Sequence, residues 1–318
     1  SPGGGVPTRA GLRPGALSMC AIDPPTGIGI RSAPAGGRQL RTGPEAGRLR
    51  ATGHRNRGPT RKETDVELKS QLMPKLKALR LSGILETLEV RNKQAIEEKC
   101  TYVEFLEKLV EDEVERRQQK QLNLRLRRSH LDPQKTLETF DFSFNPSVNR
   151  KKIYDLAGCH FVDKGEPVFL VGPAGVGKTH LAQALGHEAA RRGYDVLFVK
   201  TSRLLATLHG GRADGTYDRK LASYLNVDVL IMDDFGLKPM RPPAPEDLYE
   251  IIDGRYGKGS IVMTTNRAFE EWPELFDNSV LASAALDRLA HGATQVVITG
   301  DSFRAKGSRR KKEAVASA

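Results

Sequence analysis

The sequence between residues 168 and 179 reads Val168-Phe169-Leu170-Val171-Gly172-Pro173-Ala174-Gly175-Val176-Gly177-Lys178-Thr179. It begins with an apolar run of strand length, passes through a glycine-rich segment, and leads into residues 178–192, which are typical of a helix. Its last eight residues match the pattern G-x-x-x-x-G-K-[ST], which indicates a phosphate-binding loop when a strand precedes it and a helix follows. Both flanks are present, so we predict a P-loop here.

The residue types of this loop suit a nucleoside triphosphate. Glycines let the backbone curl into a nest of N–H donors, and the N-terminus of the following helix adds partial positive charge. We expect Lys178 to reach the β and γ phosphates and the Thr179 hydroxyl to bind Mg²⁺. The predicted cofactors are therefore ATP and Mg²⁺, and the residues expected to hold the nucleotide are Gly172, Pro173, Ala174, Gly175, Val176, Gly177, Lys178 and Thr179.

Apolar runs of strand length recur on both sides of the loop. They lie at residues 167–171, 195–199, 227–232, 260–264 and 294–299, and the stretches between them have helical patterns. Strands that alternate with helices predict an α/β fold, with a parallel sheet covered by helices on both faces.

Two carboxylates, Asp233 and Asp234, directly follow the apolar residues 229–232. Ligands of open α/β sheets gather at the carboxyl ends of the strands, and a phosphate-bound Mg²⁺ needs a carboxylate there. We assign Asp233 to the metal, directly or through water, and Asp234 to polarising the attacking water. Asn266 follows the next strand and is a candidate for orienting water or contacting the γ-phosphate, although Asn is also common in turns after strands.

Residues 64–133 are predicted to form a small helical domain. Thr101 and Glu104 form a capping box, and the helix that starts there should continue to about Ser129. Before it, leucine-rich positions recur at the spacing of one helix face: Leu68, Leu72, Leu76 and Leu79, then Leu81, Ile84, Leu85 and Leu88.

The end of the predicted helix that starts at Thr101 is strongly basic. A run of this kind is usually a solvated face, and the alternative is contact with the phosphates of double-stranded DNA. The candidate DNA-binding residues are Arg116, Arg117, Lys120, Arg125, Arg127 and Arg128.

The chain has 318 residues and a formal net charge of +11, and this charge is concentrated at the two ends. Residues 1–63 are rich in Gly, Pro and Arg and are predicted to be a disordered extension, either a DNA-binding arm or a dispensable segment. Residues 305–318 are predicted to be a disordered basic tail. Residues 61–303 carry a net charge of −1, so the charge of the folded body does not by itself indicate DNA binding.

Several partners and compartments are disfavoured. The sequence has no apolar run of about 18 residues and no secretory pattern at its start, so we expect no membrane partner. The three cysteines are far apart and form no C-x-x-C motif, which favours a reducing, cytoplasmic compartment. Residues 134–149 form a linker, and its alternating aromatic residues predict an extended segment that packs against the following domain.

Taken in order, these motifs resemble an AAA+ ATPase, and more closely the IstB-like transposition helper proteins, which are kin of DnaC-like helicase loaders. The resemblance runs from about residue 68 to residue 304. It implies that residues 150–304 form an AAA+ P-loop NTPase domain, preceded by the small all-α domain. Its further matches are Lys178-Thr179-His180-Leu181-Ala182, Asp233-Asp234-Phe235-Gly236, Thr265-Asn266-Arg267, Glu271-Trp272, Asp287-Arg288-Leu289 and Gly300-Asp301-Ser302-Phe303-Arg304.

The resemblance implies that a neighbouring subunit inserts Arg288 towards the γ-phosphate, and that Arg304 is a sensor-2-like arginine. The alternative for Arg288 is an ion pair with a local acid, such as the adjacent Asp287. Two features depart from the family. Asp234 stands where many AAA+ proteins have Glu, which bears on fast hydrolysis, and few residues follow Asp301 to form a helical lid.

The resemblance therefore implies an ATPase that assembles as a homo-oligomer on double-stranded DNA, recruits or activates a transposase, and is reset by hydrolysis. A DnaC-like helicase loader is the nearest alternative. A small-molecule P-loop kinase and a nucleotide switch that does not hydrolyse ATP are further alternatives, and turnover measurements separate them.

Overall fold

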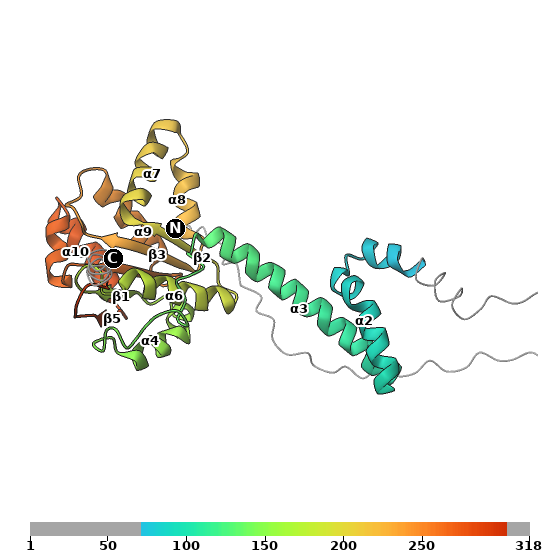
Figure 1. Cartoon of the computed structure of the whole chain (residues 1–318). Coiled ribbons are helices and arrows are strands. Elements are labelled where there is room, and N and C mark those ends of the chain that lie inside the picture. The colour runs from blue at the N-terminus through green and yellow to red at the C-terminus, as the bar shows by residue number, and fades with distance from the viewer. Residues whose placement is uncertain (1–70, 304–318) are drawn as a thin grey trace, which may run out of the picture. The chain divides into compact units, whose positions relative to one another are not determined.

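A five-stranded parallel sheet lies at the centre of the C-terminal part of the chain (Figure 1). The computed structural model describes residues 71–303, so Leu68, Arg304 and both predicted tails lie outside the described residues. The strands are β1 (Val168–Val171), β2 (Val196–Lys200), β3 (Val229–Phe235), β4 (Ser260–Thr265) and β5 (Thr294–Val297), in the spatial order β2-β3-β4-β1-β5. All five predicted strands are present, and the α/β fold is confirmed.

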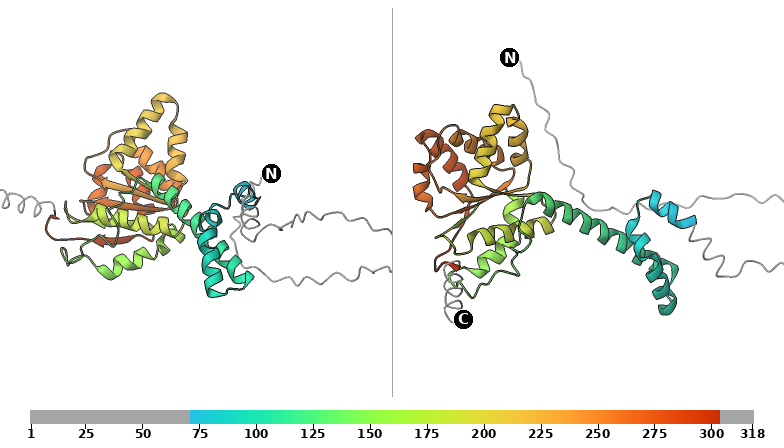
Figure 2. Two further views of the ribbon diagram at one scale, coloured as in Figure 1. Left: turned by 45° about the vertical axis from the view of Figure 1, so that its right-hand side comes forward. Right: turned by 45° about the horizontal axis from the view of Figure 1, so that its top comes forward.

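The sheet is buried on both faces because successive residues of each strand point to opposite sides. In β1, Val168 and Leu170 join one apolar core, whereas Phe169 and Val171 join the other. The first core contains residues of α4 (Arg150–Ala157), α5 (His160–Asp163) and α6 (Lys178–Arg191). The second contains residues of α7 (Thr201–Asp214), α8 (Tyr217–Leu225), α9 (Ala244–Arg255), the 3₁₀-helix η1 (Phe269–Leu275) and α10 (Ser279–Ala290). Figure 2 shows the sheet between these two layers.

The parallel register brings the predicted site residues to one edge of the sheet. The loop after β1 leads into α6, β3 carries Asp233 and Asp234 near its carboxyl end, and Asn266 directly follows β4. The pairing of β3 with β4 shifts between Met232 and Phe235, which places an irregularity at the two aspartates.

The described residues before the linker are mostly helical. A helix covers residues 71–78, and it is followed by α2 (Ser82–Glu98) and α3 (Tyr102–Ser129). The predicted capping box is present, since Thr101 Oγ1 accepts from the Glu104 N–H at 3.3 Å and Glu104 Oε2 accepts from the Thr101 N–H at 2.7 Å. The end of α3 at Ser129 also agrees with the prediction. None of the helices within residues 71–303 combines the length and apolarity needed to cross a membrane.

The linker over residues 134–149 packs as predicted but is not extended. Phe140 and Phe142 contact the apolar core beneath α6. Its backbone forms a series of turns because polar side chains accept hydrogen bonds from N–H groups two residues later. Asp141 Oδ1 accepts from Ser143 N at 2.9 Å, for example. The prediction of an extended segment was wrong, because alternating aromatic residues indicate which side chains are buried and do not determine the backbone conformation.

Candidate functional site

The P-loop has the left-handed backbone that a phosphate nest requires. Gly175 and Gly177 have φ values of 86° and 99°, which favour glycine. Lys178 folds back over the loop, and its Nζ donates to the carbonyls of Gly172 at 2.8 Å and Pro173 at 2.7 Å. The loop therefore presents its backbone, a lysine ammonium and the N-terminus of α6 to a common space.

Asp233 joins β3 to the start of α6. Its side chain is buried, and Oδ1 accepts from the Thr179 hydroxyl at 2.8 Å and from the Thr264 hydroxyl at 2.6 Å. Thr201, the first residue of α7, donates to the Asp233 carbonyl at 3.0 Å. A hydroxyl and a carboxylate from separate elements are thus held together, and both are hard oxygen ligands of the kind Mg²⁺ prefers.

Asp234 has a different environment from Asp233. Its φ is 58°, its N–H donates to Thr264 Oγ1 at 3.0 Å, and its side chain is 37% exposed. Lys200 Nζ, at the end of β2, lies 3.5 Å from Asp234 Oδ2. Asp234 therefore faces the cavity, whereas the Asp233 side chain is buried.

A cavity of about 420 Å³ lies against Lys178, Thr179 and Asp234. Among the predicted site residues, Asp234 and Asn266 line it together with most of the P-loop. The remaining wall comes from two other segments, the linker and the end of the described chain. Its lining residues are Lys135, Thr139, Phe140, Asp141, Phe144, Asn145, Ala174, Gly175, Val176, Gly177, Lys178, Thr179, His180, Asp234, Asn266 and Phe303.

The end of the described chain packs directly on the P-loop. The Phe303 N–H donates to the Gly175 carbonyl at 3.0 Å, and the Phe303 ring meets the Phe144 ring edge-on with centroids 4.8 Å apart. A Cβ at Gly175 would lie 2.1 Å from Ser302 Oγ, so this approach requires glycine. The linker also approaches the loop closely, since a Cβ at Gly177 would lie 2.7 Å from a ring carbon of Phe140.

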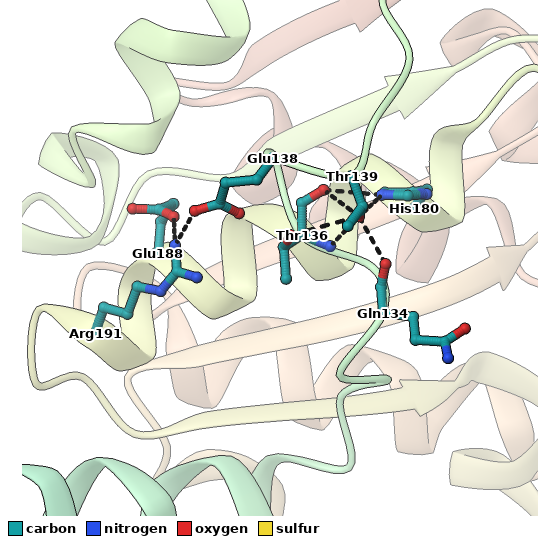
Figure 3. A network of polar contacts seen from close by, with 7 residues as sticks. All are labelled: Gln134, Thr136, Glu138, Thr139, His180, Glu188 and Arg191. Atoms are coloured by element: carbon teal, nitrogen blue, oxygen red, sulfur yellow. Dashed lines mark hydrogen bonds and ion pairs between the residues drawn. The ribbon is translucent and has the colours of Figure 1, made fainter.

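Hydrogen bonds fix the linker against α6, as Figure 3 shows. His180 Nε2 donates to the Thr136 carbonyl at 2.9 Å, and Arg191 Nη1 donates to Glu138 Oε1 at 2.7 Å. The Thr136 hydroxyl and Arg191 together lower the pKa of Glu138 to about 2, which keeps this carboxylate charged. The linker wall of the cavity therefore has a defined position relative to the P-loop helix.

One buried donor at this wall has no partner within the described residues. Asn145 is 4% exposed, and its Oδ1 accepts from Ser147, but its Nδ2 makes no hydrogen bond. The rings of Phe144 and Phe303 also line the cavity, and aromatic walls suit a planar ligand such as a nucleobase. Together with the loop nest and the Thr179 contact to Asp233, the cavity fits a nucleotide with a bound Mg²⁺.

Arg288 does not lie in this cavity. Its Nε is 2.8 Å from Asp253 Oδ1, and its Nη1 donates to the Ala284 carbonyl at 2.9 Å. The local acid that pairs with it is therefore Asp253 of α9, and Asp287 is exposed. Arg304 lies outside the described residues.

The structure divides the basic residues of α3 into two groups. Arg116 pairs with Glu86, Arg117 pairs with Glu113 at 2.8 Å, and Arg125 lies 3.9 Å from Asp195. Lys120, Arg127 and Arg128 are exposed, and none of them forms an ion pair with another residue in the range 71–303. Only the second group has its charge uncompensated by described neighbours.

Sequence reasoning missed several residues of the site. Thr264 bonds to Asp233, Lys200 pairs with Asp234, and Phe144 and Phe303 line the cavity. Thr264 could have been predicted from the sequence, because it is a polar residue near the end of the apolar strand next to the P-loop strand. The two phenylalanines carry no such local signal, because their role depends on contacts between distant segments.

Comparisons with known proteins identify the family of this chain. A family model described as IstB-like ATP binding protein matches residues 74–312. A Mycobacterium tuberculosis protein, whose name describes it as an ATP-binding protein in an insertion sequence, is 44% identical over 230 residues, which cover 72% of this chain and 92% of that protein. An insertion-sequence ATP-binding protein of Pseudomonas aeruginosa is 41% identical over 239 residues, covering 75% of this chain and 89% of that protein.

Among solved structures, the crystal structure of the DnaC helicase loader matches with a TM-score of 0.44 and 27% identity, covering 52% of this chain and 97% of that chain. The family model spans most of the described residues, including the P-loop, both aspartates and the helical residues before the sheet. The chain belongs to the family of IstB-like ATP binding proteins.

Proposed function

We propose that this protein is an ATP-dependent helper of transposition. In this proposal it binds ATP with Mg²⁺, oligomerises on double-stranded DNA, recruits or activates a transposase, and is reset by ATP hydrolysis. The observation that carries the proposal is the hydrogen bond of 2.8 Å between Thr179 and Asp233, because it joins the two elements of a P-loop metal site across the sheet. The names of the insertion-sequence relatives support the biological setting.

The phosphates would be held by the backbone of residues 172–179 and by the Lys178 ammonium. The metal would be held by Thr179 and Asp233, and it would supply charge neutralisation for the phosphates. The base would lie against the rings of Phe144 and Phe303, which line the cavity.

Hydrolysis requires groups that orient water and neutralise charge. Asp234 and Asn266 line the cavity, so Asp234 would polarise the attacking water and Asn266 would orient it. No arginine is found among the described residues that line the cavity. We therefore assign the arginine finger to Arg288 of a neighbouring subunit, and Arg304 to a sensor of the nucleotide.

DNA would contact the exposed part of the basic run on α3. Arg116, Arg117 and Arg125 are expected to contribute less than Lys120, Arg127 and Arg128, because nearby carboxylates already compensate their charges.

The test is the salt dependence of duplex DNA binding in the presence of ATP and Mg²⁺. Replacing Lys120, Arg127 and Arg128 with Ala should lower the slope of log K against log salt by about one per lost phosphate contact. A matched control replaces Lys75, Lys77 and Lys93, three exposed lysines elsewhere in the helical part, and should leave the slope nearly unchanged.

Equal slopes for both triple variants would contradict the assignment of DNA to this part of α3. Assembly on DNA that is the same with ATP and with ADP would contradict the ATP-dependent step. Specific binding to a replicative helicase in place of a transposase would favour the helicase-loader alternative.

A further inference from the structure

Arg288 is held by two residues of the neighbouring helix α9. Its Nε lies 2.8 Å from Asp253 Oδ1, and its Cζ lies 5.4 Å from the centre of the Tyr249 ring. Tyr249 and Asp253 are four residues apart in α9, so their side chains lie on one face of the helix, one turn apart. The Ala284 carbonyl of α10 accepts the third contact, from Nη1 at 2.9 Å. The guanidinium thus has an acid at one edge, a carbonyl at another and a ring beneath it.

This arrangement is not needed to hold α9 and α10 together. Both helices contribute fully buried apolar residues to the same core, among them Ile251 of α9 and Ala285 of α10. The ion pair itself is partly exposed, with 29% of the Arg288 side chain and 50% of the Asp253 side chain accessible. An exposed pair of this kind adds little to folding stability.

The contacts instead define the direction of the guanidinium. Nη1 donates a hydrogen bond and Nε lies at ion-pair distance from Asp253, whereas no residue in the range 71–303 accepts a hydrogen bond from Nη2. The guanidinium is planar, so fixing two of its nitrogens and one face also fixes where the third nitrogen points. A group that must meet a phosphate on another molecule benefits from this, because its rotamers are restricted before the encounter.

We propose that Tyr249 and Asp253 are positioning residues for Arg288, which they hold with Nη2 presented to the nucleotide of an adjacent subunit. The inference rests on the proposed function, since it needs Arg288 to act on a neighbour's triphosphate. Asp253 sets the direction through Nε, and the Tyr249 ring supports the plane of the guanidinium through a cation–π contact.

Mixed oligomers test the finger and its positioning separately. One protomer carries Arg288→Ala and keeps its P-loop, and the other carries Lys178→Ala and keeps its arginine. Each alone should have little ATPase activity. The mixture should recover activity, because the intact P-loop of one protomer is completed by the intact Arg288 of the other. An affinity tag on one protomer verifies that mixed assemblies form.

The second protomer then receives a further substitution. Asp253→Ala should lower the recovered turnover about tenfold, because a catalytic group that is out of position slows the reaction even when the subunits still assemble. Asp253→Glu should keep most of the recovery, because a carboxylate remains to pair with Arg288. Tyr249→Leu should lower recovery and Tyr249→Phe should preserve it. Glu246→Gln, which removes an exposed carboxylate from the same helix, is the matched control and should have no effect.

The outcomes separate the two ideas. No recovery in the first mixture would show that Arg288 does not act between subunits. This result would contradict both the finger assignment and the positioning inference. Full recovery with Asp253→Ala would overturn the positioning role alone. A loss of ATP affinity or melting temperature in an Asp253→Ala chain with an intact P-loop, matching its loss of turnover, would mark Asp253 as structural and also overturn the inference.

Discussion

The two ends of the candidate nucleotide cavity are built in different ways. The phosphate end consists of consecutive residues, 172–179, together with Asp233, and its groups are held by hydrogen bonds between neighbouring strands and α6. The other end combines the linker with the last described residue, Phe303, and these segments are far apart in the chain.

The difference lies in the physics that each end uses. Phosphates are recognised by backbone N–H groups and by charge, so a short loop with a fixed glycine pattern can provide the site. A base is recognised through its flat faces and a few hydrogen bonds, and any rings brought together by folding can provide these. The phosphate end therefore leaves a local pattern in sequence, and the other end does not.

The largest effect is expected at the phosphate end. Lys178→Ala removes the ammonium that would contact the β and γ phosphates, and charged hydrogen bonds of this kind are worth about 3 kcal/mol together, or about a hundredfold in Kd. Calorimetry should show that both ATP and inorganic tripolyphosphate lose affinity. Unchanged ATP binding would contradict the assignment of this cavity.

Asp234→Asn should separate chemistry from binding at the same end. The carboxylate is partly exposed and paired with Lys200, so its loss should leave the P-loop intact and ATP affinity close to that of the unmodified protein. Removing a general base typically costs about a hundredfold or more in kcat. The measurement is phosphate release with saturating ATP, and normal turnover would remove Asp234 from the mechanism. Lys238→Ala, a lysine that lies outside the cavity lining, serves as a control.

The phosphate end could be predicted from the sequence to a greater extent than the base end. The P-loop, Asp233, Asp234 and Asn266 were predicted, and the structure brings them to one edge of the sheet because parallel strands end there. The five strands and the capped helix α3 were also predicted, since period and capping are local properties.

The remaining features depend on tertiary contacts. The ion pairs of Arg116 and Arg125 and the pairing of Arg288 with Asp253 join segments that sequence spacing does not relate. Sequence alone suggested Asp287 as the partner of Arg288, because adjacency along the chain is the only proximity that a sequence shows.

A moderate effect is expected when only the base end is changed. Phe303→Ala removes a ring from the cavity lining, and alanine substitution of a stacked aromatic costs about 1–3 kcal/mol, so ATP affinity should fall about tenfold. Tripolyphosphate affinity should be unchanged because it has no base. Equal losses for both ligands would show that Phe303 supports the loop through Gly175, and that the two ends are not independent.

The smallest effect concerns the attachment of the linker to α6. The pKa of Glu138 falls from its ordinary value of 4.5 to about 2, first through the Thr136 hydroxyl and then through Arg191. Because the folded pKa is the lower one, this contribution to stability is fully present above pH 4.5 and is lost as the pH falls towards 2. The pair is exposed, so the melting temperature of the unmodified protein should exceed that of Glu138→Gln by at most about 2 °C near neutral pH.

The difference in melting temperature should stay constant from pH 8 to about 5. It should then shrink on further acidification, because the carboxylate of Glu138 becomes protonated first in the unfolded chain. Thermal unfolding of both proteins across this range provides the measurement, with Glu246→Gln as a variant that lacks an exposed carboxylate remote from the linker. A difference that persists unchanged to pH 3 would show that the charge of Glu138 does not hold the linker. In that case the contact of His180 with Thr136 would be the main attachment of the base end to the phosphate end.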